Sequence, residues 1–278
     1  MPELPEVETI ARTLRLGTNG LPGLPGRTVT HALIQWARTL AEPLPAIFAS
    51  QIEGLTFKDV SRRGKFLVCE IPPFYLLTHL RMSGDLKIVT LAEPAGSHDR
   101  VTLELDNNTR LVFNDTRKFG RMWFTPNPES VLQSLGPDAL DPDLQPEKFF
   151  GMLHGKKRML KPLLMDQSFL AGLGNIYTDE ALFLARLHPA TRADTLSLEQ
   201  ASQLLNAIRS VLFEGIKRNG ASIDWVYRGG TFQNHFNVYR QTGKDCLRCG
   251  NIITRTIIGQ RSTHYCPACQ VYQEKEEV

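Results

Sequence analysis

The chain has 278 residues, enough for two ordinary domains and a small additional module. Its formal net charge is only +3, so the total charge neither requires nor excludes a polyanionic partner. No apolar run approaches the length of a membrane span, and the acidic start lacks the basic and apolar segments of a secretory signal. We therefore expect a cytoplasmic protein with no membrane partner, and the absence of an oligomerisation element favours a monomer.

The first eight residues, MPELPEVE, carry an unusual set of reactive groups. Proline is small, so we expect Met1 to be removed, which leaves Pro2 with a free secondary amine. An α-amino group titrates near pH ~8 and is more nucleophilic at neutral pH than a lysine. When such an amine attacks an aldehyde-like carbon it forms an iminium, and the neighbouring Glu3 and Glu6 are candidate proton donors or acceptors. The alternative is an ordinary helix start, with proline in the first turn beside acidic residues.

An amphipathic helix is predicted after this start, because Val7, Ile10, Ala11 and Leu14 share one face, and Gly17 ends it. Paired Pro-Gly steps then predict a loop over 21–26. From residue 27 to about 124 the pattern is β. The expected strands cover 28–34, 65–71, 75–80 and 86–91, and two alternating runs, 101–105 and 111–113, flank a turn at 106–108. Short strands at this spacing predict a sandwich or flattened barrel.

The second half of the chain is predicted to be helical. A Pro- and Asp-rich linker at 126–146 precedes a helical stretch over 165–187, which 172–175 interrupts. Ser197 and Gln200 form a capping-box pattern, and the helix that they begin is expected to end at Asn219-Gly220. Residues 221–237 are irregular and rich in glycine.

Four of the five cysteines occur as two CxxC pairs separated by sixteen residues, the spacing of a four-thiolate zinc site. The predicted ligands of one structural Zn²⁺ are Cys246, Cys249, Cys266 and Cys269. Between the pairs, 254–258 and 261–265 are expected to form a hairpin across Gly259-Gln260. A segment of about forty residues cannot fold on apolar burial alone, so the metal holds it together. His264 is a redundant alternative ligand, and Cys69, in an apolar run, is predicted to be a buried core thiol.

Two clusters of positive charge suit a polyanion, although such runs are also common on solvated surfaces. The first comprises Lys156, Lys157, Arg158 and Lys161. The second has five basic residues against one acid between residues 240 and 264. The basic balance around Arg261 favours a nucleic acid as the partner of the zinc hairpin, with protein contact as the alternative.

Taken together, the N-terminal PELPEVET, the β-rich domain, the helical middle and the four-cysteine module resemble the formamidopyrimidine-DNA glycosylase family. Five further motifs occur in the family's order: GKF at 64–66, HLRMSG at 79–84, DTRKFG at 115–120, GLGNIY at 172–177 and QRST at 260–263. The resemblance covers nearly the whole chain. It implies an α+β multidomain fold: an N-terminal helix and β-sandwich domain over 1–135, a helix–two-turn–helix domain over 136–238, and a zinc finger over 239–278.

The resemblance also implies a bifunctional DNA glycosylase and abasic-site lyase of base excision repair, which removes 8-oxoguanine and formamidopyrimidines from damaged duplex DNA. Pro2 is then the nucleophile at C1′, Glu3 protonates the ring oxygen or the departing base, and Glu6 orients the amine or shuttles protons. Lys65 serves the β-elimination and Arg261 the δ-elimination. The implied DNA contacts are His79, Met82, His98, Arg117, Phe119, Lys156 and Asn175. Such a protein acts on the nucleoid within the cytoplasm.

The activity that the resemblance implies requires a damaged nucleotide to be flipped out of the stack, which costs a few kcal/mol. By the resemblance, Met82 would be the wedge that fills the gap, Arg117 would face the orphaned cytosine, and Phe119 would press on the neighbouring base pair. Without the resemblance, core packing is the better interpretation of Met82 and Phe119. An ordinary surface histidine is the alternative for His98.

Two departures and two competing functions remain. The 21–26 insertion lengthens the loop after the first helix. Residues 222–230 do not match the lesion-capping loop of the family, which leaves the preferred oxidised base open. The first competing function is an endonuclease VIII-type glycosylase for oxidised pyrimidines, and the second is a zinc-dependent DNA-binding protein without catalysis.

Overall fold

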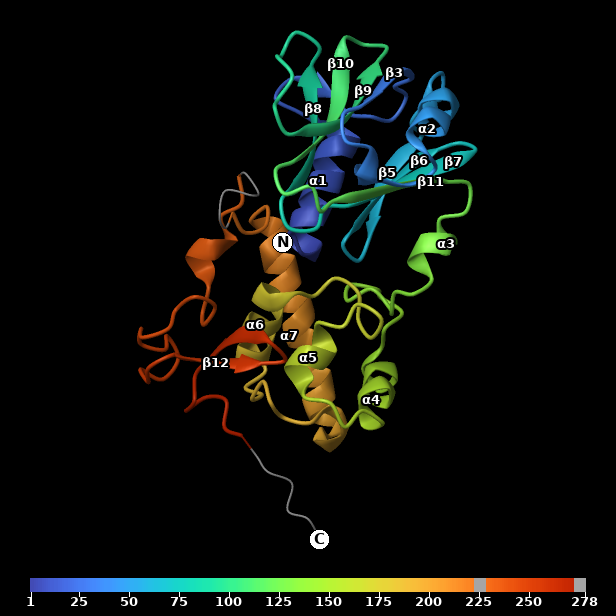
Figure 1. Cartoon of the computed structure of the whole chain (residues 1–278). Helices are drawn as coiled ribbons and strands as arrows, with labels where there is room; N and C mark the ends of the chain where they lie inside the picture. The colour runs from blue at the N-terminus through green and yellow to red at the C-terminus, as the bar shows by residue number, and fades with distance from the viewer. Residues whose placement is uncertain (223–228, 273–278) are drawn as a thin grey trace. The chain divides into compact units, whose positions relative to one another are not determined.

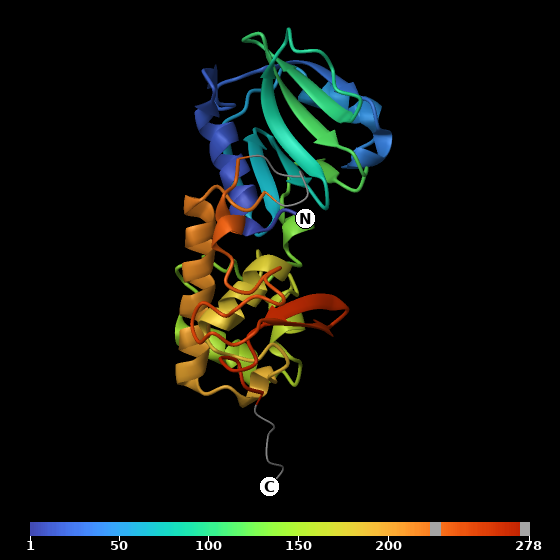
Figure 2. The same ribbon diagram turned by 90° about the vertical axis from the view of Figure 1, so that its left-hand side faces the viewer.

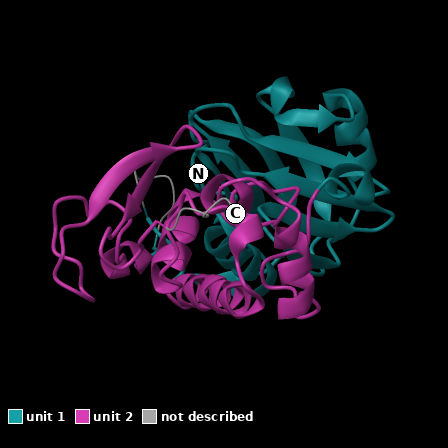
Figure 3. Ribbon diagram, turned by 90° about the horizontal axis from the view of Figure 1, so that it is seen from below, with its two compact units in different colours: residues 1–134, 219–230 teal, residues 135–218, 231–278 magenta. Residues whose placement is uncertain are grey.

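The computed structural model describes residues 1–222 and 229–272. The chain forms two compact units, drawn in teal and magenta in Figure 3. Unit 1 comprises residues 1–134 and 219–230, and unit 2 comprises residues 135–218 and 231–278. The chain therefore returns to unit 1 for a short segment before it completes unit 2.

Unit 1 contains two sheets that share one apolar core, as predicted (Figure 1). The four-stranded sheet has the order β3 (Val29–Ile34), β9 (Asp99–Leu105), β10 (Thr109–Asp115) and β8 (Gly84–Thr90). The five-stranded sheet has the order β4 (Leu40–Glu42), β11 (Arg121–Thr125), β7 (Phe74–His79), β6 (Phe66–Ile71) and β5 (Asp59–Arg63). All pairs are antiparallel except β4 with β11. The free thiol of Cys69 lies in this core, where burial raises its pKa to about 12.

Helix α1 (Leu4–Leu16) packs its apolar face against β5 and β6. It ends at Gly17, which has a positive φ of 88°, as the sequence predicts. Glu8 on the helix accepts a hydrogen bond from Arg62 Nε of β5 at 2.9 Å. The predicted loop over 21–26 is partly wrong, because β2 (Leu21–Pro22) pairs with β1 (Gly17–Thr18). Unit 1 also contains η1 (Ala37–Thr39), α2 (Pro45–Ile52) and α3 (Glu129–Leu132).

The helices of unit 2 pack around α7 (Leu198–Lys217), the long helix in orange in Figure 2. Helices α4 (Pro146–His154) and α6 (Asn175–Leu184) lie against it, and α5 (Leu160–Leu164) contacts α6. The predicted capping box is confirmed, since Gln200 N donates to Ser197 Oγ and Ser197 N donates to Gln200 Oε1. Short 3₁₀ turns, η2 (Ala193–Thr195) and η3 (Phe232–His235), complete the connections.

The helix expected over residues 165–171, before the predicted interruption at 172–175, is wrong, because α5 ends at Leu164 and α6 begins at Asn175. Side chains there bond the backbone in place of helical hydrogen bonds. Gln167 Nε2 donates to Leu173 O at 2.8 Å, Gly172 N donates to Gln167 Oε1, and Ser168 N donates to Asp166 Oδ1. These bonds fold the segment into turns that lead into α6.

In the part of the chain that the structure describes, no helix is long and apolar enough to cross a membrane.

Candidate functional site

The N-terminus of α1 carries the first group of predicted site residues. Glu3 occupies the N-cap, and a capping box joins it to Glu6. Glu3 N donates to Glu6 Oε2 at 2.8 Å. Glu3 and Glu6 are 3% and 2% exposed, and Pro2 is also buried. The same residues can therefore both begin the helix and serve as candidate catalytic groups, because the capping box fixes the backbone of Glu3 and Glu6.

The second carboxylate oxygen of Glu6 binds the segment that returns to unit 1. Ala221 N donates to Glu6 Oε1 at 2.7 Å. Gly220 has a φ of 77°, and a Cβ at that position would lie 2.6 Å from Glu6 Oε1. Only glycine fits this close approach without strain. Both oxygens of Glu6 thus accept backbone hydrogen bonds, which fixes the first turn of α1 against residues 220–221.

Lys65 and His79 lie close together at one end of the five-stranded sheet. Lys65 follows Gly64 in the turn between β5 and β6 and is only 4% exposed. Phe66, the next residue, pairs with His79 across β6 and β7. Burial, the charge of Arg81 and the charge of Lys65 lower the pKa of His79 to about 3. His79 is therefore neutral at physiological pH. Arg81 N donates to His79 Nδ1 at 3.1 Å, so the ring proton resides on Nε2.

Met82, Arg117 and Phe119 lie on two loops rather than in the core. Met82 is 37% exposed and Phe119 is 51% exposed. Core packing, the alternative interpretation of both residues, is therefore wrong. The Arg117 guanidinium lies 4.9 Å from the centre of the Phe119 ring. Lys118 stacks on Trp36 in a second cation–π contact, with Nζ 4.0 Å from the ring centre.

Asp115 joins these two loops at the end of β10, and sequence reasoning gave it no role. Its carboxylate accepts hydrogen bonds from the Ser83 hydroxyl, from Arg117 N at 3.2 Å and from Gly120 N at 2.7 Å. Its backbone N donates to His98 O at 2.9 Å, so a third loop ends at the same point. In the sequence, the spacing of Asp115 and Arg117 could have indicated this role, because an aspartate often binds the backbone N–H two residues later.

His98, half-buried in the loop before β9, lies in unit 1, whereas the predicted contacts Lys156 and Asn175 and the predicted catalytic Arg261 lie in unit 2. Lys156 is exposed after α4, and Arg261 is exposed at the first position of β13 (Arg261–Tyr265). Asn175 is the first residue of α6, and its Oδ1 is buried without a hydrogen-bond partner.

The basic cluster at 156–161 is only partly a surface cluster. Lys161 has no exposed side-chain surface, and its Nζ lies 2.6 Å from Asp179 Oδ1. Arg158 Nη1 lies 2.7 Å from Asp166 Oδ2, and this pair lowers the pKa of Asp166. Lys161 is therefore not available to a polyanion. In the sequence, the apolar residues around Lys161 in the run LKPLL could have indicated that Lys161 is buried.

Four cysteine sulfurs form the predicted metal site. The Sγ atoms of Cys246, Cys249, Cys266 and Cys269 all lie within 4.8 Å of one another. The backbone N–H of Asn251 lowers the pKa of Cys249 to about 7, whereas burial raises the pKa of Cys269 to about 12. A bound cation is needed to hold all four as thiolates. The donor set and its compactness fit one tetrahedral Zn²⁺ with no open position, so the zinc is structural.

The zinc hairpin has the predicted strands, β12 (Thr254–Ile258) and β13. Gly259 and Gln260 both have positive φ, as a two-residue turn requires. His264 is not a ligand, because it faces Asp179, with Nδ1 3.1 Å from Oδ2.

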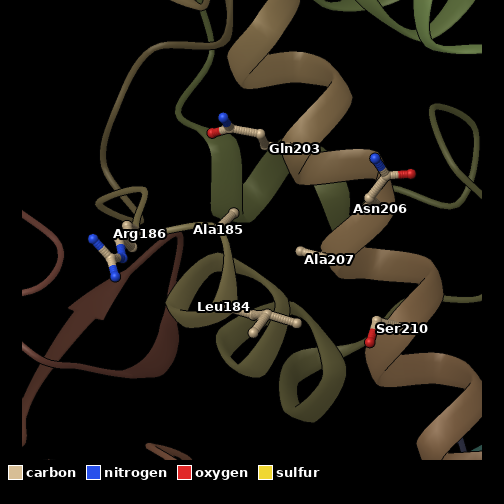
Figure 4. A pocket seen from close by; sticks show the side chains of 7 residues that line it. All are labelled: Leu184, Ala185, Arg186, Gln203, Asn206, Ala207 and Ser210. Atoms are coloured by element: carbon tan, nitrogen blue, oxygen red, sulfur yellow. The ribbon is translucent and has the colours of Figure 1, made fainter. Parts of the chain in front are cut away.

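A pocket of about 530 Å³ lies between the end of α6 and the middle of α7 (Figure 4). Its lining is Leu184, Ala185, Arg186, Gln203, Asn206, Ala207 and Ser210. None of the predicted site residues contributes to it.

Three family profiles match successive parts of the chain. The formamidopyrimidine-DNA glycosylase N-terminal domain matches residues 1–122, the H2TH domain of the same family matches 135–226, and the zinc finger found in FPG and IleRS matches 243–271. The chain is 42% identical to the formamidopyrimidine-DNA glycosylase of Chloroflexus aurantiacus over 285 residues, with both chains fully covered. It is 40% identical to that of Protochlamydia amoebophila, with 97% of this chain and 99% of the relative covered.

The fold matches solved structures of the same class. One is the Lactococcus lactis glycosylase bound non-covalently to DNA with an abasic site, with a TM-score of 0.88 and 34% identity over 98% of this chain and 100% of that one. Another is the Lactococcus lactis protein with DNA containing a formamidopyrimidine lesion, with a TM-score of 0.88 and 33% identity over 97% of this chain and 100% of that one. The chain belongs to the formamidopyrimidine-DNA glycosylase family.

Proposed function

We propose that this protein is a bifunctional DNA glycosylase and abasic-site lyase that excises 8-oxoguanine and formamidopyrimidines from duplex DNA. Full-length membership of the family supports the reaction class. The observation that carries the assignment to these residues is the burial of Glu3 and Lys65, both in unit 1, the unit that contains Pro2. Charged side chains are rarely buried to this extent unless they have a specific role or partner.

The first step replaces the bond between the sugar and the base. After removal of Met1, the Pro2 nitrogen forms a bond to C1′, and the electrons of the glycosidic bond leave with the base. Glu3 delivers a proton to the ring oxygen or to the departing base, so that the sugar opens and an iminium forms on Pro2. Glu6 holds the Glu3 backbone by the 2.8 Å hydrogen bond, which orients both groups.

Strand cleavage then follows from the acidity of the iminium. Loss of the C2′ proton expels the 3′ phosphate, with Lys65 serving this β-elimination. A second proton loss expels the 5′ phosphate, with Arg261 serving this δ-elimination. Water finally hydrolyses the iminium and frees the Pro2 amine. Both cations also neutralise phosphate charge, as Lys and Arg do at transferring or departing phosphates.

The DNA contacts divide into wedge, orphan-base and backbone groups. Met82 fills the gap left by the flipped nucleotide, Arg117 offers its donors to the orphaned cytosine, and Phe119 presses on the adjacent pair. The exposure of Met82 and Phe119 supports these roles. The phosphate contacts are His79, His98, Lys156 and Asn175. Neutral His79 binds as an Nε2–H donor.

We also propose the three-domain division at 1–135, 136–238 and 239–278, in which zinc serves only to fold the last domain. The protein acts as a monomer on damaged DNA, and its substrate places it with the nucleoid in the cytoplasm. Light scattering coupled to size exclusion tests the oligomeric state.

The deciding experiment is borohydride trapping on a duplex with 8-oxoguanine opposite cytosine, followed by mass spectrometry of the cross-linked peptide. An adduct on Pro2 is expected. Pro2→Thr, which also permits Met1 removal but presents a primary amine, is the matched variant.

A preference for thymine glycol over 8-oxoguanine would instead favour the endonuclease VIII-type activity. Binding without any adduct or cleavage would reduce the protein to a zinc-dependent DNA-binding protein. An adduct on a lysine would retain the lyase and overturn the assignment of the nucleophile.

A further inference from the structure

Three titratable side chains are buried together in unit 2, and the proposed reaction uses none of them. Lys161 of α5 and Asp179 of α6 have no exposed side-chain surface, and His264 of β13 is 5% exposed. One Asp179 oxygen lies 2.6 Å from Lys161 Nζ, and the other lies 3.1 Å from His264 Nδ1. A fully buried ion pair contributes little net stability compared with well-packed apolar residues. Stability alone does not account for this cluster.

The cluster holds β13 through its backbone. His264 N donates to Asp179 Oδ2 at 2.9 Å, and Lys161 Nζ donates to Ser262 O at 2.7 Å. Ser262 directly follows Arg261. The two fixed positions therefore lie one and three residues beyond Arg261, and the helices α5 and α6 set where the strand begins.

The hairpin is also fixed at both of its ends. At the tip, a Cβ on Gly259 would lie 3.0 Å from Pro162 Cβ, so the turn packs directly on the residue after Lys161. At the base, the zinc ligand Cys266 follows β13 immediately. The zinc fixes the chain at Cys266, just after β13, and the Lys161–Asp179 pair holds the strand itself at Ser262 and His264, one and three residues after Arg261.

We infer that Asp179 is a positioning residue for Arg261. With Lys161 it holds β13 at Ser262 and His264, so that the Arg261 guanidinium meets the phosphate that leaves in the δ-elimination. This inference rests on the proposed role of Arg261. It assigns no contact with DNA to Asp179, which acts only through the strand.

The test uses the full-length, zinc-loaded protein and a duplex with a preformed abasic site, and measures the ratio of δ- to β-elimination product. This ratio does not depend on the fraction of active enzyme. Asp179→Asn is expected to lower it on the order of tenfold, because a displacement of 1 Å can cost up to ~10²-fold in rate. Borohydride trapping at Pro2 is expected to stay unchanged, since that step precedes the δ-elimination.

Asp179→Asn removes the negative charge beside the buried Lys161 ammonium, so a second variant protects the test against misfolding. K161M/D179L fills the same volume with apolar side chains and still removes both side-chain contacts to β13. Asp166→Asn, which breaks the more exposed Arg158–Asp166 pair of the same unit, is the matched control and should leave the ratio unchanged. Arg261→Ala gives the largest fall in the ratio of δ- to β-elimination product that loss of the guanidinium can cause.

An unchanged ratio in folded, zinc-loaded K161M/D179L, together with a lowered ratio in Arg261→Ala, would overturn the positioning role. Loss of zinc from K161M/D179L would also overturn it, because the cluster would then serve the metal site. An unchanged ratio in Arg261→Ala would remove the proposed role of Arg261 itself, and the inference with it.

Discussion

The Ser83 hydroxyl donates a hydrogen bond to the carboxylate of Asp115, and this contact joins the loop that carries Met82 to the loop that carries Arg117 and Phe119. In the proposed function Met82 and Arg117 enter the DNA together, so that function depends on the relative position of the two loops. Asp115→Asn is expected to lower 8-oxoguanine excision about tenfold and to weaken the preference for cytosine opposite the lesion, because a charged hydrogen-bond acceptor is worth ~1.5–3 kcal/mol.

The control for Asp115 lies at the other end of the same strand. Thr109 Oγ1 donates to Asn107 Oδ1 at 2.6 Å. Thr109→Val removes this bond, so it should leave opposite-base selectivity intact. Equal loss of selectivity in both variants would show that Asp115 acts only on the stability of β10.

Substitutions of two methionines should distinguish a side chain that intercalates into DNA from one that packs in the core. Met82→Ala should change the free energy of unfolding by less than ~0.5 kcal/mol but strongly reduce excision, because Met82 is on the surface. Met122→Ala, at a fully buried site, should cost ~2–5 kcal/mol and lower the melting temperature. Denaturant unfolding and single-turnover excision, measured on both variants, check this. Normal excision by Met82→Ala would exclude the wedge role.

His79 should make the fold acid-sensitive. Its pKa falls from 6.5 in the unfolded chain to about 3 in the folded protein, so below pH 6.5 the unfolded chain binds the additional proton. The contribution of neutral His79 to the free energy of unfolding is fully present above pH 6.5 and declines progressively as the pH falls towards 3. Between pH 7 and pH 5 the loss is about 2 kcal/mol.

His79→Gln should remove this part of the pH dependence, since glutamine can still accept from Arg81 N without binding a proton. The free energy of unfolding of both proteins at pH 5, 6 and 7 provides the measurement. Parallel pH curves for the wild type and His79→Gln would contradict the lowered pKa.

Substitution of Glu3 should lower the rate of base excision and leave the affinity for DNA nearly unchanged. Glu3→Gln keeps the size of the side chain but removes its proton transfer, so base excision should fall ~10²–10⁴-fold. Affinity for duplex DNA with an abasic-site analogue should change little. Single-turnover rates and fluorescence anisotropy measure the two quantities, and Glu129→Gln, on the surface of the same unit, is the control. A proportional loss of binding would assign Glu3 a structural role.

The zinc should be stoichiometric and essential to the hairpin. Elemental analysis is expected to find one zinc per chain, and Cys249→Ser should lose it. Since structural zinc contributes ~10–16 kcal/mol of apparent binding energy, stripping with a chelator should unfold the hairpin and abolish the δ-elimination. Amide exchange across residues 246–269 reports this unfolding directly. Full retention of zinc by Cys249→Ser would contradict four-thiolate ligation.

The sequence by itself determined the features that depend on local patterns. The start and end of α1, the capping box at Ser197, the strands of the sandwich and the zinc hairpin follow from periodicity, caps, turns and ligand spacing, which act over a few residues. The family motifs likewise determined the reaction class. The helix predicted over 165–171 is wrong because Gln167 and Asp166 bond the backbone there, an arrangement that hydrophobic periodicity does not detect.

Only the tertiary structure decided which charged and apolar side chains are buried. Lys161 belongs to a basic run in the sequence, yet it is buried against Asp179, eighteen residues away, whereas Met82 and Phe119 have apolar side chains and lie exposed. Asp115 gains its role from Ser83, which is thirty-two residues distant. Burial and hydrogen bonding at such separations depend on how the elements pack, because the free energy of a charge or an apolar surface depends on its surroundings and not on its neighbours in the chain.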